Sequence, residues 1–508
     1  MGMSGWRKTV DHGTKRKHDG DGPEMRGTSK NATTMGHHAP SATTEYNTPD
    51  TKFNPKLPFP RDDDYYKTLY TEELDFGLLG RHDPELNAVL DRGSHLDFTN
   101  PKSVMQLTKT LLRLNFGLLI DLPTDRLCPP VPNRHNYILW LKDLLDSSSP
   151  SYLDRGNPAQ PVTGLDIGTG ANLIYPLLGC AQRPSWSFIA TDVDAKSLAC
   201  ARKNVELNGL QTRIRVVDRV LEDCLIPLDE LGLETIDFAM VNPPFYTSEM
   251  ELADLAKQKS RPPNSACTGA PIEMVCAGGE VGFVRRIIDE SLVLRRRVQW
   301  YTSMLGKQSS LEMIVNILKQ HGVDNYAVTA FIQGKKTRRW AVGWSFESRR
   351  PSLSASRGCE PSAGKKLLPC LTEVTIGTWY APPQHIEKML RDTIENLDLV
   401  SWTWDQPPSS GLGFVDGNVW GRAYRRQRAR EQIIRRTGNG QPVHSHPLAQ
   451  QKSHEECAFG FSVAIQPLKD LGSIENRCTV VVRWLQGNEY AVFESFTGFL
   501  RKSMCSDR

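Results

Sequence analysis

The sequence Asn242-Pro243-Pro244-Phe245 directly follows a mostly apolar run, 236–241, that is typical of a buried strand. A turn of this composition suits the methylation of a planar exocyclic amine, whose delocalised lone pair makes it a weak nucleophile. The Asn242 side-chain oxygen and the Pro243 carbonyl can accept the two N–H bonds of such an amine. The prolines hold these acceptors rigidly, and Phe245 offers a ring face for stacking on a base. By itself the stretch fits an ordinary Asn-Pro turn with a core phenylalanine equally well.

A glycine-containing turn lies upstream of this stretch. The strand-like run 162–167 leads into the turn 166–172, and a helix-like stretch follows. Glycines let a ligand approach the backbone closely, so a strand, a glycine turn and a helix together favour a nucleotide-type binding site. Leu173 stands where a third glycine would complete the dinucleotide-binding fingerprint, and that fingerprint therefore fails.

An acidic residue follows the next strand. The run 187–190 ends in Thr191-Asp192-Val193-Asp194, and an acid at the tip of the second strand can accept both ribose hydroxyls. Asp192 is our choice, and Asp194 could instead cap the following helix. Glycine turn, ribose acid and NPPF in this order describe an S-adenosylmethionine (SAM) methyltransferase, and the predicted cofactor contacts from the first two motifs are Asp166, Gly168, Gly170 and Asp192.

Composition excludes several other classes. The chain has 508 residues and a formal net charge of +4, so global charge says little about partners. Eleven cysteines occur without CxxC pairs, which argues against a disulfide scaffold or a zinc site. Histidines are not at ligand spacing, so we expect no metal. No apolar stretch is long enough to span a bilayer.

Alternating strand and helix signals predict the fold of the central region. Strands are expected near 163–167, 187–192, 213–217, 236–241, 300–305, 326–332 and 340–345. With the intervening helices they predict an α/β fold, a doubly wound and mostly parallel seven-stranded sheet of the Rossmann-like class I type. Ligands then bind at the carboxyl ends of the strands, where all three motifs fall.

Five segments are expected along the chain. They are a disordered polar and basic tail (1–50), an N-terminal helical extension of the catalytic domain (51–150), the SAM-dependent methyltransferase domain (151–346), a linker (347–366) and a small accessory α+β domain (367–508). The tail contains Lys15-Arg16-Lys17, which is either a nuclear import signal or a solvated charged run.

Clusters of basic residues favour a polyanionic partner. A long polar segment after the NPPF turn, about 247–279, could form a wall of the substrate groove. A strand–strand turn near 335 and the stretch 421–436, which has Tyr424 interleaved and is expected on a helix, are rich in basic side chains that could contact phosphates. The predicted RNA-binding residues are Lys257, Lys259, Arg261, Lys335, Lys336, Arg338, Arg339, Arg425, Arg426 and Arg428.

The chain also resembles a known family. It is similar to the eukaryotic methyltransferase-like protein 16 family, N6-adenosine RNA methyltransferases that act on U6 small nuclear RNA, and more distantly to bacterial enzymes that methylate an adenine of large ribosomal RNA. The resemblance covers about 75–346, and its matching stretches are 115–118, 131–137, 165–171, 174–179, 242–245, 278–280, 304–307, 333–334 and 339–341.

The resemblance implies roles for individual residues. Arg134 would pair with the methionine carboxylate of SAM, Gly168 would lie against its methionine and ribose portion, and Asp192 replaces a glutamate that is usual in animal members. Asn242 would touch both cofactor and target amine. Asp223 falls near a threonine that binds the adenine of the cofactor. The family's lysine-bearing loop after the third strand reads 218–223 here and lacks that lysine.

These observations predict an RNA adenine-N6 methyltransferase that uses SAM, acts on structured RNA such as U6 small nuclear RNA, and works in the nucleus or the cytoplasm. Protein partners and oligomeric state are left open. A protein N5-glutamine methyltransferase is an alternative, because an amide NH2 poses the same chemical problem. An RNA-binding scaffold with an inactive methyltransferase fold and a DNA adenine methyltransferase are further alternatives.

Overall fold

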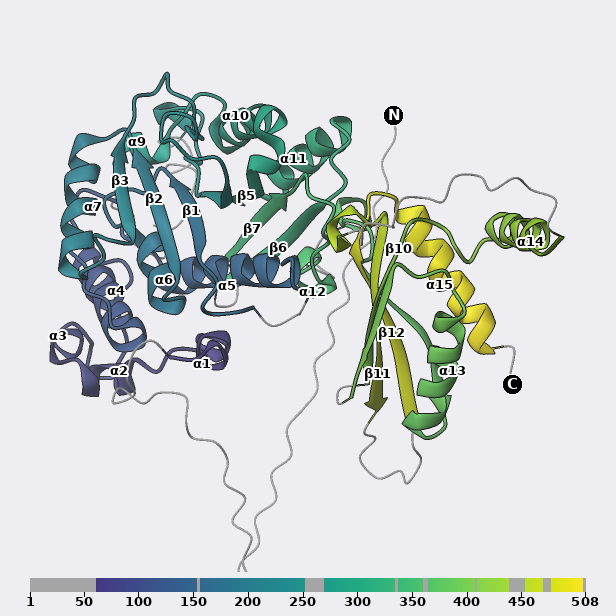
Figure 1. Cartoon of the computed structure of the whole chain (residues 1–508). Coiled ribbons are helices and arrows are strands. Elements are labelled where there is room, and N and C mark those ends of the chain that lie inside the picture. Colours follow the sequence, from purple (N-terminus) through teal and green to yellow (C-terminus); the bar gives the residue numbers. More distant parts are fainter. Residues whose placement is uncertain are drawn as a thin grey trace, which may run out of the picture. The chain divides into compact units, whose positions relative to one another are not determined.

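The computed structural model describes residues 61–152, 156–251, 269–333, 337–359, 364–406, 409–437, 453–468 and 477–505. The expected tail (1–50) and its basic run therefore lie outside the described residues, as do Lys257, Lys259, Arg261, Lys335 and Lys336. The described chain contains two β-sheets, each with its own helices (Figure 1).

The first sheet confirms the prediction of a seven-stranded, mostly parallel arrangement. Its order is β3-β2-β1-β4-β5-β7-β6, and β7 runs in the direction opposite to the other six strands. The strands are β1 (Val162–Ile167), β2 (Trp186–Asp192), β3 (Ile214–Asp218), β4 (Ile236–Val241), β5 (Val298–Leu305), β6 (Tyr326–Gln333) and β7 (Thr337–Trp344).

Helices cover both faces of this sheet, as a doubly wound fold requires. Strand residues alternate between two cores: Phe238 and Met240 of β4 join one, and Ala239 and Val241 join the other. The first core includes residues of α4 (Pro101–Phe116), α5 (Val131–Ser147), α6 (Ile174–Gln182) and α7 (Ala195–Leu207). The second includes α10 (Gly279–Leu294) and α11 (Gln308–Gln320), which lie above the sheet in Figure 1.

Buried charges join the N-terminal helix α1 (Asp63–Thr68) to α5 and to the residue that follows α6. Helices α2 (Phe76–His82) and α3 (Pro84–Asn87) follow α1 along the chain. The Asp63 carboxylate lies 2.7 Å from the Lys142 ammonium and 2.8 Å from the Arg183 guanidinium, and Arg183 also pairs with Asp146. Burial lowers the pKa of Lys142, whereas Asp63 raises it. Removing one partner would leave a buried charge uncompensated, so α1 is an integral part of the domain.

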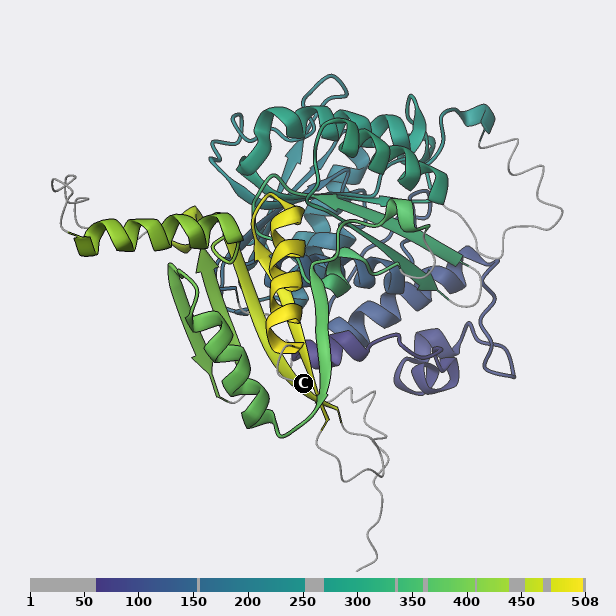
Figure 2. The ribbon, with the colours of Figure 1, turned by 90° about the vertical axis from the view of Figure 1, so that its right-hand side faces the viewer.

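The second sheet is antiparallel, with the order β8-β12-β11-β10-β9. It consists of β8 (Glu373–Tyr380), β9 (Ser401–Asp405), β10 (Ser410–Val415), β11 (Phe459–Leu468) and β12 (Arg477–Gln486). Helices α13 (Pro383–Glu395) and α15 (Tyr490–Cys505) pack on one face, and α14 (Arg422–Thr437) extends outward (Figure 2).

The β9–β10 pair was not expected from the sequence. Glycines weaken a strand signal, and β10 contains Gly411 and Gly413, which lie opposite Trp404 and Trp402 of β9. A Cβ atom at Gly411 would lie 2.2 Å from the Trp402 ring and 2.7 Å from the Trp404 ring. The glycines are therefore part of the packing, because the two indoles occupy the space that a side chain at Gly411 would need, and the Phe461 ring occupies the corresponding space at Gly413.

The segment 347–359 connects the two sheets through direct contacts and includes α12 (Leu353–Ser356). Arg350 donates from its backbone to the Leu485 carbonyl and from Nε to the Gly487 carbonyl, and its guanidinium lies 4.2 Å from the centre of the Trp484 ring. The Tyr152 hydroxyl also donates to Gln486. A chain cut before the second sheet would lose these contacts.

The glycine packing predicts opposite effects for two alanine substitutions. Gly411→Ala should lower the free energy of unfolding by about 1–3 kcal/mol, since the new methyl group overpacks the two indoles. Gly498→Ala, on an exposed position of α15 where nothing lies within 4 Å, should raise it by about 0.5–1 kcal/mol. Urea denaturation of both variants measures this. A Gly411→Ala protein as stable as wild type would contradict the packing argument.

Candidate functional site

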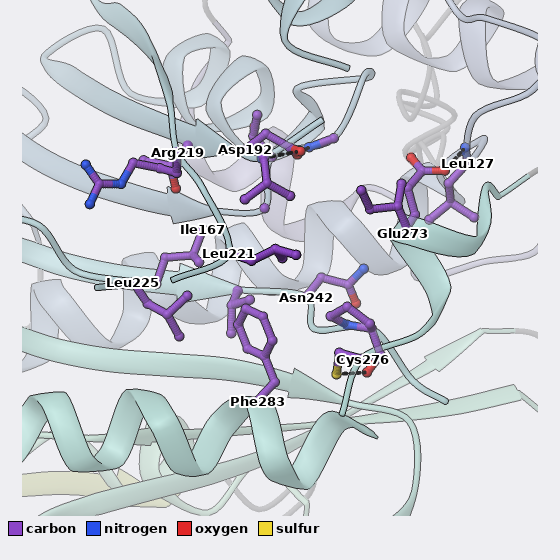
Figure 3. A pocket seen from close by; sticks show the side chains of 18 of the residues that line it. Leu127, Ile167, Asp192, Arg219, Leu221, Leu225, Asn242, Glu273, Cys276 and Phe283 are labelled. Atoms are coloured by element: carbon purple, nitrogen blue, oxygen red, sulfur yellow. Dashed lines mark hydrogen bonds between the residues drawn. The ribbon is translucent and has the colours of Figure 1, made fainter. Parts of the chain in front are cut away.

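A cavity of about 480 Å³ lies at the carboxyl ends of β1, β2 and β4 (Figure 3). This is the edge where an open α/β sheet binds its ligands, and the size suits a nucleotide-like molecule. Of the predicted site residues, the cavity brings together Arg134, Gly168, Gly170, Asp192, Asp223, Asn242 and Pro244. Asp166, Pro243 and Phe245 are not part of its lining.

The turn after β1 adopts the left-handed conformation at three positions. Gly168 and Gly170 have φ values of 69° and 66°, and a Cβ at Gly168 would meet nothing within 4 Å. Leu173, which replaces the third glycine of the dinucleotide fingerprint, has φ 53° with a fully buried side chain. Burial of that side chain offsets the backbone strain, and the open space above Gly168 leaves room for a ligand.

Asp192 at the end of β2 is anchored to the glycine turn. Its Oδ2 accepts from the Gly170 N–H at 2.8 Å, and its Oδ1 accepts from the backbone N–H groups of Val193 and Asp194. Burial raises the pKa of this carboxyl, and the three backbone hydrogen bonds lower it. Asp194 accepts from the Ser197 N–H at the start of α7 and is therefore the helix cap. Asp192 keeps lone pairs available toward the cavity.

Arg134 on α5 is a buried cation close to the Asp166 carboxyl. Burial raises the pKa of that carboxyl and the Arg134 charge lowers it, but the two side chains do not form a close ion pair. Its side chain is only slightly exposed, at 5% for the whole residue, and its Nη1 donates to the Met304 sulfur at 3.2 Å. The guanidinium lies 5.6 Å from the centre of the Tyr175 ring. Among the described residues Arg134 makes no ion pair. Since a buried unpaired charge is costly, its position in the cavity wall suits an anionic ligand group.

Two acceptor oxygens near the cavity are also unused within the described chain. The Asp166 Oδ2 accepts from the Thr169 hydroxyl at 2.6 Å, whereas its Oδ1 is buried without a partner. Burial raises the pKa of Asp166 to about 7. The Asn242 Oδ1 is likewise buried and unpartnered. Buried polar atoms nearly always have hydrogen-bond partners, so both oxygens are candidates for contacts with bound molecules.

The NPPF turn is fixed on its far side by the segment before α10. The Tyr246 N–H donates to the Met274 carbonyl, and the Cys276 N–H donates to the Tyr246 carbonyl, both at 3.0 Å. Met274 ends the short helix α9 (Pro271–Met274). Phe245 itself is half-buried, and the Arg339 guanidinium lies 5.7 Å from its ring centre. The turn is therefore held in place independently of any ligand.

Several cavity residues were not found by sequence reasoning. The Glu273 Oε2 accepts hydrogen bonds from the Leu127 and Ala270 N–H groups, at 3.0 and 2.8 Å. Phe283 of α10 and Leu221, after β3, add apolar surface (Figure 3). The hydrogen bond from the Ala270 N–H to Glu273, three residues later, has the spacing that is typical of a helix start. Nothing in the local sequence, however, indicates that Glu273 lies beside the cavity at the end of β1.

The predicted RNA-binding residues within the described chain lie in different settings. Arg338 is exposed, with its guanidinium 5.7 Å from the Trp340 ring centre, whereas Arg339 is partly buried beside Phe245. Arg425, Arg426 and Arg428 are all exposed on α14.

Comparison with known proteins identifies the family. Residues 65–348 match a family described as RNA methyltransferase. This chain belongs to that family. It is 33% identical over 416 residues to the U6 small nuclear RNA (adenine-(43)-N(6))-methyltransferase of Schizosaccharomyces pombe, covering 81% of this chain and 96% of that protein. The family resemblance and the fold class stated from the sequence are thus confirmed.

Two solved structures of the human relative METTL16 are also similar. Its catalytic domain in complex with MAT2A 3'UTR hairpin 1 is 40% identical, with a TM-score of 0.48, covering 54% of this chain and 92% of that chain. Its N-terminal domain in complex with SAH is 38% identical, with a TM-score of 0.45, covering 55% of this chain and 96% of that chain.

Two features are absent from the described residues. They contain no group of three or more His, Cys, Asp or Glu side chains that could hold a metal ion. Within the same ranges, no helix combines the length and the apolarity that crossing a bilayer requires.

Replacing Arg134 should have opposite effects on the stability of the protein and on its affinity for the cofactor. Arg134→Met should weaken binding of S-adenosylhomocysteine by about 10- to 100-fold, the scale of one charged hydrogen-bonded contact. It should also raise the melting temperature of the cofactor-free protein, because it removes a buried charge that makes no close ion pair among the described residues. Calorimetry and thermal melts measure the two effects.

Arg213→Met is the matched control. Arg213 donates to the carbonyls of Trp186, Cys180 and Arg183, so its loss should lower the melting temperature and leave cofactor affinity unchanged. If Arg134→Met behaved like this control, the cavity would not hold the cofactor carboxylate at Arg134.

Proposed function

We propose that this protein transfers a methyl group from SAM to the N6 amine of an adenosine in structured RNA, and that U6 small nuclear RNA is a substrate. The observation that carries the proposal is the buried and unpartnered Asn242 Oδ1, which lies at the proline turn in a cavity that also contains the unpaired Arg134. Membership of an RNA methyltransferase family and the substrate in the name of the yeast relative, U6 small nuclear RNA, support it.

The residues around the cavity fit SAM. Arg134 would hold the cofactor carboxylate by charge-assisted hydrogen bonds, and the unpartnered Asp166 Oδ1 is an acceptor of the kind that an ammonium group requires. Asp192 would accept the ribose hydroxyls, with the Gly168 turn leaving space for close approach. The cofactor supplies a methyl group on a sulfonium, which is already a good leaving group.

Asn242 and Pro243 then act on the target amine. The Asn242 Oδ1 has no partner among the described residues, and the Pro243 carbonyl lies next to it along the chain. The turn therefore presents two acceptors, and neither proline adds a backbone donor that would compete. Both amine hydrogens are thereby held, and the lone pair is directed out of the base plane toward the methyl donor. Positioning and acceptor electrostatics carry most of the acceleration. Water takes the proton afterwards, so no covalent intermediate on the protein is needed.

The target adenosine must leave its stack to reach this turn. Phe245 is half-buried with part of its surface still open, and we propose that the flipped base stacks on this ring. Asp223, which lines the cavity after β3, would lie near the adenine of the cofactor.

We further propose that α14 binds RNA phosphates. Tyr424 and Arg428 both contact Asp398, so this side of the helix faces the domain. Arg422, Arg426 and Arg430 recur at intervals of four residues on the opposite side. They are exposed, and none of the three has an acidic partner within the described ranges. Such a stripe suits a polyanion.

Asn242→Ala tests the catalytic assignment. We expect it to abolish methylation of RNA while binding of S-adenosylhomocysteine falls far less, because the side chain holds the amine chiefly during transfer. Incubation with labelled SAM and U6 RNA, followed by mapping of the modified nucleotide, measures this. Full activity of the variant would reject the assignment.

The same assay separates the rival activities. A wild-type protein that modifies a glutamine-containing peptide and leaves RNA unmodified would establish the N5-glutamine methyltransferase, and a preference for DNA would establish a DNA adenine enzyme. Binding of RNA with no binding of SAM would establish the inactive scaffold.

The α14 stripe predicts a change in salt dependence. The triple variant Arg422→Ala, Arg426→Ala, Arg430→Ala should bind RNA more weakly, and the slope of log affinity against log salt should fall by about 2, given about 0.7 per phosphate contact on a single strand. Cofactor affinity should not change. Fluorescence anisotropy at several salt concentrations measures the slope.

The matched control removes three charges that lie outside α14. Lys365, Lys366 and Lys388 are exposed, and their replacement by alanine should leave the slope near the wild-type value. Equal effects of the two triple variants would show that only net charge matters. Point variants are preferable to truncation here, because Arg350 is bonded to the second sheet.

We also propose that the protein works in the nucleus, where U6 small nuclear RNA would be available. Lys15-Arg16-Lys17 is the candidate import signal, and loss of nuclear accumulation on its replacement by alanines would support that role.

A further inference from the structure

We propose that Glu280 is a positioning residue for methyl transfer, which acts through Gly306 on the ring of Phe245. This inference rests on the proposed function, because it concerns the ring on which the target base would stack. Glu280 does not line the cavity and does not contact the NPPF turn through any hydrogen bond of its own.

Both oxygens of the Glu280 carboxylate accept hydrogen bonds from one backbone turn, and its charge also raises the pKa of Arg339, which burial lowers. Glu280 is the second residue of α10 and is 4% exposed. Its Oε2 accepts from the Gly306 N–H at 2.6 Å, and its Oε1 accepts from the Lys307 N–H at 3.2 Å. Burying a carboxylate is expensive unless its charge is satisfied. Here the charge secures the backbone that leaves β5, next to the proposed substrate position.

Gly306 is in contact with both the carboxylate and the aromatic ring. A Cβ atom at this position would lie 3.1 Å from the Phe245 Cδ1 and 3.3 Å from the Glu280 Oε2. The ring of Phe245 therefore packs directly against the peptide that Glu280 holds. Moving this peptide by a few tenths of an ångström moves the surface against which the ring lies.

The first turn of α10 contacts the catalytic turn at a second point. Gly279 has φ 59°, and a Cβ there would lie 3.4 Å from the Phe245 carbonyl oxygen and 3.1 Å from the Thr247 Cγ2. The Arg339 guanidinium also lies 5.7 Å from the centre of the Phe245 ring. Gly279 thus limits where the Phe245 backbone lies, while Glu280, through Gly306, limits where the ring lies.

Glu280→Gln is the direct test. The carboxamide has the same shape but presents an NH2 group to one of the two N–H donors, so one of the two hydrogen bonds is lost. Misplacing a reacting group by part of an ångström lowers turnover steeply, and we expect kcat to fall by about 10- to 100-fold. The dissociation constant of S-adenosylhomocysteine should stay at the wild-type value, because the cavity lining is unchanged. A purely structural role would instead lower cofactor affinity and kcat together.

Gly306→Ala is the second variant and crowds the ring while the Glu280 carboxylate itself is retained. Its methyl group crowds the Phe245 Cδ1, so kcat should fall with cofactor affinity retained. This variant keeps the inference testable if Glu280→Gln does not fold, and its own melting temperature reports any general loss of stability.

A double-mutant cycle with Phe245→Ala decides whether the effect passes through the ring. In the Phe245→Ala background, Glu280→Gln and Gly306→Ala should each cause no further loss of kcat, since the side chain that they displace is gone. Equal fold-losses with and without the ring would overturn the inference. A wild-type protein that does not methylate RNA would reject the proposed function, whereas active wild type with fully active Glu280→Gln and Gly306→Ala would reject this inference alone.

Discussion

The arrangement of this site depends on buried polar groups that the protein does not satisfy by itself. Arg134 has no acidic partner among the described residues, and the Asp166 Oδ1 and Asn242 Oδ1 lack hydrogen-bond partners there. Interiors rarely leave such groups unpaired, because desolvation of each one costs free energy. Their persistence at the strand ends requires a scaffold that holds them rigidly, and a ligand with complementary groups offsets the cost.

Much of the surrounding structure can be understood as that scaffold. Asp166 lies in β1, and Asn242 directly follows β4. These two strands are parallel neighbours, and their carboxyl ends meet at one edge of the sheet. Arg134 comes from α5, before the sheet begins, and α5 is fixed by the hydrogen bond from the Tyr137 hydroxyl to Thr302 at 2.9 Å. The N-terminal helices are thus required for the site, and their buried ion pairs with Asp63 explain how they stay in place.

Runs of arginine in this chain lie in two different settings. Arg296 donates to the Phe346 carbonyl, and Arg297 donates to the Leu233 and Glu234 carbonyls and pairs with Asp229, so both stabilise the start of β5. The arginines on the outer side of α14 have no acidic partner among the described residues. Composition alone does not distinguish these cases, because a guanidinium can cap a carbonyl or contact a phosphate with the same donors.

Local patterns in the sequence were enough for the seven strands, the glycine turn, Asp192 and the NPPF turn, because strand periodicity and turn residues act over a few neighbours. The parallel-sheet rule then placed these motifs at one edge. Tertiary packing decided what no local pattern carries. It placed Glu273 and Phe283 in the cavity wall, Arg339 beside Phe245, and the Trp402 and Trp404 rings over Gly411 of β10. These contacts join segments distant along the chain, and their geometry depends on how helices and strands fill space together.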